Sequence, residues 1–90
     1  MGADTDVRAL ATGILGPLVA YDREHGGDLV KTLRVYFLCN GNASRAAKAL
    51  FLHRNGMLYR LSRVEDLLGV AVSDGEARLA LEVAVRILAE

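Results

Sequence analysis

Apolar residues recur along the chain at the spacing of amphipathic helices, which favours an all-α fold. The first apolar stripe comprises Val7, Leu10, Ala11, Ile14 and Leu15. Gly16-Pro17 interrupts this pattern. Because proline suits the first turn of a helix, we expect a separate short helical segment over residues 18–24.

The next helix is expected from about Leu29 to Cys39. Asp28, directly before it, is a residue type that caps helix N-termini. The turn Asn40-Gly41-Asn42 ends this helix, because Gly and Asn tolerate the left-handed backbone that a helix stop requires.

A short helix and a longer helix then follow with very few residues between them. An Ala-rich segment, capped by Asn42 or Ser44, runs to about residue 50, and the longer helix runs over about residues 53–68. So short a connection forces the two helices to cross at a steep angle. This arrangement is typical of a helix-turn-helix motif, here at about residues 42–68.

The longer helix has distinct apolar and polar faces. Its inward stripe comprises Met57, Leu61, Val64 and Leu68. At about 100° per residue, the side chains that point the opposite way are Asn55, Tyr59, Ser62 and Asp66.

The last helix is expected from about Asp74 to Ala89 and is apolar on nearly every side. Ser73 and Glu76 have the spacing of a capping box at its start. A helix of this kind is buried on more than one side, in the centre of the domain, against a second subunit or against a missing domain. We therefore expect a homodimer.

Size and composition indicate one small domain over residues 1–90. The chain is 52 % hydrophobic and contains a single cysteine, Cys39, which excludes an internal disulfide and fits a reducing compartment. No apolar run reaches the roughly 18–20 residues needed to cross a bilayer, and the N-terminus lacks a signal-peptide pattern. We expect a cytoplasmic protein without membrane association.

No arrangement of residues points to an enzyme. His25 and His53 have no metal-ligand spacing to each other or to Cys39. No Ser, Cys or carboxylate pair has a recognisable catalytic arrangement, and no Gly-rich phosphate loop follows a strand. We therefore expect neither catalysis nor a metal or cofactor.

The distribution of charge, rather than its total of zero, points to nucleic acid. Between Leu29 and Val64 there is no Asp or Glu. The seven basic residues of this window are Lys31, Arg34, Arg45, Lys48, Arg54, Arg60 and Arg63. Such a segment is the electrostatic footprint of a DNA-binding face. The alternative is an ordinary solvated surface whose basic bias arose by chance.

Docking the motif on DNA assigns roles to eight residues. The N-terminal part of the second helix enters the major groove, which brings His53, Arg54 and Asn55 nearest to the base edges. Tyr59 and Arg60 follow, and Arg63 lies on the flank. Ser44 and Arg45, at the start of the preceding helix, are expected to face the phosphate backbone.

These residues resemble a known family. Gly41-Asn42-Ala43-Ser44-Arg45-Ala46-Ala47, Leu52-His53-Arg54-Asn55 and Tyr59-Arg60-Leu61 are similar to the C-terminal helix-turn-helix domain of PucR/CdaR-type bacterial transcriptional regulators. The resemblance covers roughly residues 15–88, and a shorter one, to the DNA-binding end of Fis, covers residues 41–64. The resemblance to the PucR/CdaR-type regulators implies a small Fis-like helical bundle at the C-terminal end of a longer regulator. A small-molecule effector is then expected only through domains absent from this chain.

Two positions depart from the family pattern. Gly56 stands where the family usually has Thr or Ser, and Leu58 where it usually has Arg. Glycine inside a helix costs about 1 kcal/mol relative to Ala. The lost hydroxyl and guanidinium are both expected DNA contacts, so weaker or altered DNA binding is expected.

The sequence thus predicts sequence-specific DNA binding as the output domain of a bacterial transcriptional regulator. The alternative is a helical protein-interaction or dimerisation module with weak or lost DNA binding. Its partner surface would contain Leu58, Tyr59 and the last helix.

Overall fold

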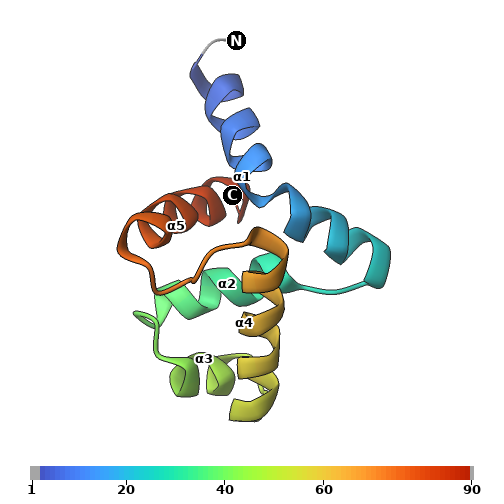
Figure 1. Ribbon diagram of the computed structural model, residues 1–90, viewed down its shortest axis with the longest axis vertical. Helices are drawn as coiled ribbons and strands as arrows, with labels where there is room; N and C mark the ends of the chain where they lie inside the picture. Colours follow the sequence, from blue (N-terminus) through green and yellow to red (C-terminus); the bar gives the residue numbers. More distant parts are fainter. Residues whose placement is uncertain (1–2, 90) are drawn as a thin grey trace.

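Five α-helices make up the described part of the chain. The computed structural model describes the backbone of residues 3–89 and the side chains of residues 6–88. The helices are α1 (Ala3–His25), α2 (Leu29–Leu38), α3 (Ala43–Ala49), α4 (Arg54–Leu68) and α5 (Gly75–Ala89). No strand occurs among residues 3–89, so the all-α prediction is confirmed. α1 and α5 form one end of the molecule, and α3 with the start of α4 forms the other (Figure 1).

The core is aliphatic and draws on every helix. Its large, fully buried side chains include Leu15, Leu18, Leu33, Met57, Val64 and Val85. Each such side chain contributes about 1.5–3 kcal/mol when it leaves water. The stripe predicted for α4 is buried at Met57, Leu61 and Val64 and half-buried at Leu68. This stripe therefore orients α4, with its opposite face toward solvent.

A single long helix replaces the two segments predicted near the N-terminus. α1 continues through Pro17, so the prediction that Gly16-Pro17 would separate two helices is wrong. Pro17 has no N–H to donate to the carbonyl of Gly13, and its ring crowds that carbonyl, which bends a helix. Figure 1 shows α1 changing direction midway. Leu15 and Leu18, fully buried on either side of Pro17, anchor both halves to the core.

The cap of α2 comes from α1. Asp28 occupies the N-cap position, as predicted, but its side chain makes no capping hydrogen bond. Instead the carboxylate of Asp22 accepts from the backbone N–H of Leu29 at 2.7 Å and of Val30 at 3.1 Å. Because Asp22 caps α2, the Asp28 carboxylate is available for a contact described below.

The start of α5 also differs from the prediction. Asp74 caps this helix, since its carboxylate accepts from the N–H of Glu76 at 3.1 Å and of Ala77 at 3.2 Å. The prediction of a capping box that starts at Ser73 is therefore wrong: the capping side chain is that of the next residue, Asp74. Asp74 is the residue directly before the helix begins at Gly75, which is the position from which a side chain reaches the first-turn N–H groups.

Candidate nucleic-acid interface

α3 and α4 pack closely across a short turn. Residues 50–53 connect them. Ala46 and Ala47 are buried, and their small side chains let the neighbouring helices approach. The N–H of Leu52 donates to the carbonyl of Ala47 at 2.8 Å, and the N–H of Phe51 donates to that of Lys48 at 3.1 Å. These hydrogen bonds fix the angle at which α4 leaves α3.

The first turn of α4 is exposed and polar. His53 is the N-cap residue, and its side chain makes no capping hydrogen bond. His53, Arg54 and Asn55 are all exposed. First-turn N–H groups have no partner within their helix, and with the helix dipole they favour an anion. This end of α4 therefore combines backbone donors, a guanidinium, an amide and an imidazole.

The polar face of α4 lies in solvent, as its spacing predicts. Asn55, Ser62 and Asp66 are exposed, and Tyr59 is 64 % exposed. Leu58, on the edge of this face, is 38 % exposed. The face thus offers an amide, a phenol and one hydroxyl to a ligand, with the Asp66 carboxylate toward its C-terminal end and one apolar side chain at its edge.

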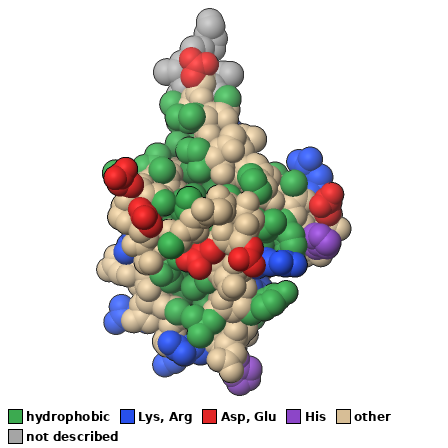
Figure 2. Space-filling view, viewed as in Figure 1, with side chains coloured by type: hydrophobic (Ala, Val, Ile, Leu, Met, Phe, Trp, Pro, Cys, Tyr) green, Lys and Arg blue, Asp and Glu red, His purple; other side chains and the backbone are tan. Residues whose placement is uncertain are grey.

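The start of α3 presents a second set of polar groups. Asn42 is its cap, because the Asn42 side chain accepts from the N–H of Arg45 at 2.9 Å. The other candidate cap, Ser44, is exposed together with Arg45 and Lys48. Figure 2 shows Lys and Arg side chains at this end of the molecule, where no Asp or Glu side chain is visible in this view, and further Lys and Arg side chains toward the middle and the other end.

Comparison with known proteins identifies the family. The family model of the PucR C-terminal helix-turn-helix domain matches residues 29–87, which contain α2, α3, α4 and all but the last two residues of α5. The chain belongs to this family. The resemblance noted in the sequence is therefore confirmed, and α1 lies outside the matched residues.

Relatives of this PucR-type domain include named regulators. The purine catabolism regulatory protein of Bacillus subtilis is 37 % identical over 68 residues, which are 76 % of this chain and 13 % of that protein. The carbohydrate diacid regulator of Escherichia coli is 38 % identical over 64 residues, or 71 % of this chain and 17 % of that protein.

A third relative is the uncharacterized protein in the pkwA 5' region of Thermomonospora curvata. It is 40 % identical over 76 residues, which are 84 % of this chain and 42 % of that protein. The chain therefore spans less than half the length of these three relatives. No solved structure is a significant match. The family is one of helix-turn-helix domains and two of these relatives are named as regulators, which indicates DNA binding.

Arg60 does not project as a lone cation in this PucR-type domain. Its guanidinium forms an ion pair with Asp28, and its Nη1 donates to the hydroxyl of Thr32 at 3.2 Å. Thr32 is fully buried and donates its own hydroxyl proton to the Asp28 carbonyl at 2.9 Å. Arg60 thereby ties α4 to the start of α2. The sequence reasoning missed Asp28 because the acid-free window begins one residue after it.

Arg63 is exposed and lies over an aromatic ring of α1. Its guanidinium carbon is 5.7 Å from the centroid of the Tyr21 ring. The pKa of Arg63 lies above its ordinary value, first because of the side-chain hydrogen bond with Tyr21 and then because of nearby Tyr59. Arg63 therefore stays cationic, held on the flank of α4 beside α1.

The two departures from the family pattern lie on the accessible side of α4. A Cβ atom at Gly56 would meet no heavy atom within 4 Å, so a larger side chain fits there. Leu58 is covered only in part, as the sequence predicts. Both positions can accept the residue types that the resemblance led us to expect.

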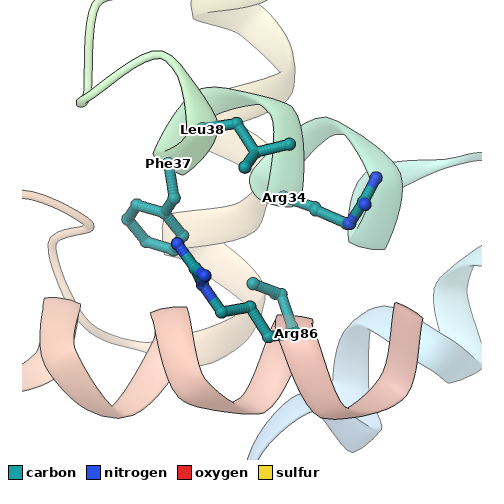
Figure 3. A pocket seen from close by; sticks show the side chains of 5 residues that line it. Arg34, Phe37, Leu38 and Arg86 are labelled. Atoms are coloured by element: carbon teal, nitrogen blue, oxygen red, sulfur yellow. The ribbon is translucent and has the colours of Figure 1, made fainter. Parts of the chain in front are cut away.

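Other candidate sites are weaker. A pocket of about 140 Å³ between α2 and α5 is lined by Arg34, Phe37, Leu38, Val85 and Arg86. Figure 3 shows Arg86 rising from α5 beside Phe37, with Arg34 and Leu38 on the facing helix. Pockets for small ligands are usually about 300–1,000 Å³, so this one is too small for a typical effector.

The described residues contain neither a metal-binding cluster nor a membrane-spanning helix. No group of three or more His, Cys, Asp or Glu side chains among them is placed to hold a metal ion. In the same part of the chain, every helix is too short or too polar to cross a membrane.

Proposed function

We propose that this chain is the DNA-binding output domain of a bacterial transcriptional regulator. In this proposal the first turn of α4 enters the major groove and reads a specific sequence. The observation that carries it is the surface at one end of the molecule. There the exposed residues His53, Arg54 and Asn55 adjoin the exposed basic residues of α3.

The base-reading roles fall to the start of α4. Arg54 pairs with guanine and Asn55 with adenine, and each good bidentate pair is worth about 1–3 kcal/mol of discrimination against the wrong base. His53 lies beside them, and Tyr59 follows one turn later. These side chains are exposed, so they reach a base edge without rearrangement of the core.

The remaining roles concern phosphates, which position the protein without reading sequence. Ser44 and Arg45 at the start of α3 contact one strand, and Arg63 contacts the backbone from the flank of α4. Arg60 reaches a phosphate only if it exchanges Asp28 for it. We therefore assign Arg60 a smaller contribution to DNA affinity than its place on the predicted recognition helix suggests.

The proposal extends to the protein's setting. Residues 1–90 form one domain, with the helix-turn-helix at about residues 42–68, and act in the cytoplasm on double-stranded DNA in the nucleoid. Two relatives are named for purine catabolism and for carbohydrate diacids. By analogy, we propose that a small-molecule effector controls this domain through domains outside these residues.

The second candidate function is a protein-interaction module with weak or lost DNA binding. The exposed Leu58 and Tyr59 favour it, because apolar and aromatic side chains together on a surface mark protein contacts. The two functions differ in their response to salt. Binding through phosphates weakens with a log–log slope of about −0.9 per neutralised phosphate, whereas binding through an apolar surface does not.

The test is fluorescence anisotropy on a mixed-sequence DNA duplex at low and at physiological salt. The protein is compared with an Arg54→Ala, Asn55→Ala double variant and with Arg86→Ala, which removes one exposed cation on α5. We expect salt-dependent binding that the double variant weakens and Arg86→Ala leaves unchanged. Absence of binding at low salt by a folded protein would overturn the proposal and favour the interaction module.

A further inference from the structure

The turn between α3 and α4 carries an aromatic side chain that the core does not use. Phe51 is 96 % exposed, and its φ of 57° lies in the left-handed region. The other non-glycine residue with a positive φ in the described chain is Asn40, a residue type that tolerates this backbone. Strained residues of this kind concentrate at ligand-binding sites. The ring of Phe51 therefore adds little to the fold and is available to a ligand.

The backbone around Phe51 is held in place on both sides. The N–H of Phe51 donates to the carbonyl of Lys48 at 3.1 Å, and the N–H of Leu52 donates to that of Ala47 at 2.8 Å. The side chains of Leu50 and Leu52 are half-buried and pack against the core. Because both neighbours point inward, the ring of Phe51 stays on the outside of the turn.

This turn leads directly into the first turn of α4. Phe51 lies two residues before His53, the N-cap residue of that helix. Two residues of chain span at most about 7 Å, so the Cα atoms of Phe51 and His53 lie within that distance. The proposed function places the start of α4 in the major groove, and the present inference rests on it. Phe51 is then beside the base edges that the groove exposes.

The surroundings of Phe51 suit DNA better than a protein partner. Lys48 and Arg54 are exposed on either side of it in the sequence, and no Asp or Glu occurs between Leu29 and Val64. Within residues 39–57, all of which the structure describes, no other large apolar side chain is exposed. A protein contact usually needs a contiguous apolar patch. DNA instead offers single apolar groups among phosphates, and in the major groove that group is the methyl of thymine.

We propose that Phe51 packs against the methyl group of a thymine in the major groove. Phe51 thereby adds a preference for thymine at one position of the DNA site, next to the bases that Arg54 and Asn55 read. The contact takes apolar surface out of water and neutralises no phosphate. It therefore changes the affinity for one base and leaves the salt dependence of binding unchanged.

The test uses a DNA duplex that the protein itself enriches from a randomised pool. Each thymine of that duplex is replaced in turn by uracil, which lacks the methyl group, and fluorescence anisotropy measures binding. We expect uracil at one position to weaken binding about fourfold, as expected for one methyl-sized group left in water. Phe51→Ala should bind the thymine duplex at least as weakly, with the same salt slope, and should lose nothing more with uracil at that position.

Leu79→Ala is the matched control for the loss of an exposed apolar side chain. Leu79 is 67 % exposed and lies on α5, outside the helix-turn-helix. We expect Leu79→Ala to bind both duplexes as the protein does. Circular dichroism checks that each variant is folded.

Two results would overturn this inference. One is a Phe51→Ala variant that binds the enriched duplex as tightly as the protein does. The other is the absence of any thymine whose replacement weakens binding by the protein but not by Phe51→Ala. Neither would touch the proposed function, because the Arg54→Ala, Asn55→Ala double variant tests it on the same duplex. Failure of the folded protein to enrich any duplex would count against the proposed function itself, and this inference would fall with it.

Discussion

The two ends of this molecule leave very different surfaces uncovered. At the α3–α4 end the exposed side chains include Arg45, Arg54 and Asn55, which suit phosphates and base edges. At the α1–α5 end they include Leu10 and Val83, which suit another apolar surface. A small helical domain can thus place a polar, basic surface and an apolar surface at opposite ends of one axis.

The difference arises from what each helix carries on the side that the core does not use. α4 buries Met57 and Val64 and places polar residues on its opposite face. α5 buries Leu81 and Val85 but still carries Leu79 and Val83 on its outer side. Both helices are anchored by the same kind of aliphatic stripe, so their functions are decided by their outer faces.

The largest expected effect comes from truncating a side chain on the buried face of α4, compared with truncating its neighbour on the exposed side. Met57→Ala should lower the free energy of unfolding by about 2–5 kcal/mol, because Met57 is fully buried. Leu58→Ala, at the next residue but 38 % exposed, should cost well under about 1 kcal/mol. Urea denaturation measures both. Equal losses would contradict the orientation of α4.

The next effect should come from restoring the family pattern at the DNA end. Gly56→Thr combined with Leu58→Arg should tighten DNA binding about tenfold, since a charge-assisted hydrogen bond is worth about 1.5–3 kcal/mol. Both positions have room for the new side chains. Fluorescence anisotropy measures the gain. As a control, Leu79→Arg adds the same charge on α5, at the other end of the molecule. An equal gain in DNA affinity from Leu79→Arg would show that the effect is one of total charge and not of direct contact at residues 56 and 58.

A smaller effect is expected from releasing Arg60. Asp28→Asn removes the ion-pair partner of Arg60 and should tighten DNA binding a few-fold, with a log–log salt slope steeper by about 0.9. The stability lost should be within about 1 kcal/mol, because the Asp28 side chain is 48 % exposed and solvent screens the pair. Glu82→Gln, which breaks the Arg78–Glu82 pair on α5, is the control. An unchanged slope for Asp28→Asn would show that Arg60 plays no part.

The smallest effect should come from the turn between α3 and α4. Phe51 has a φ of 57° and is 96 % exposed, so its ring stabilises little while its Cβ is strained. Phe51→Gly relieves about 1–2 kcal/mol of strain and costs about 0.5–1 kcal/mol in backbone entropy. We expect a small rise in melting temperature. Phe51→Ala keeps the Cβ and should leave the melting temperature unchanged. A rise in melting temperature for both variants would contradict the idea that the Cβ causes backbone strain at residue 51.

Periodicity predicted most of this fold because helix packing here follows the sequence closely. The stripe from Met57 to Leu68 and the outward residues from Asn55 to Asp66 lie as the 3.6-residue spacing requires. The prediction failed at Gly16-Pro17, which was read as a helix end, because burial of Leu15 and Leu18 holds a bent helix together. Local signals identify helix breakers, but tertiary packing decides whether a helix bends or ends.

Helix spacing also predicted part of the candidate site, namely which of its side chains are exposed, but not which of them are paired. Exposure of Arg54, Asn55 and Tyr59 follows from helix spacing alone. The pairing of Arg60 with Asp28 joins residues 32 positions apart, and no local pattern reveals such a contact. The Asp22 carboxylate that caps α2 was missed in the same way. Long-range contacts of charged groups therefore had to come from the structure.

The most direct test of the contrast between the two ends is an NMR titration of the isotope-labelled domain with duplex DNA. We expect the largest amide shift changes at residues 42–45 and 53–63, which start α3 and form most of α4. The amides of α5 and of the first half of α1 should change little. Changes concentrated on α1 and α5, with the α3–α4 end unaffected, would contradict the assignment of DNA binding to that end.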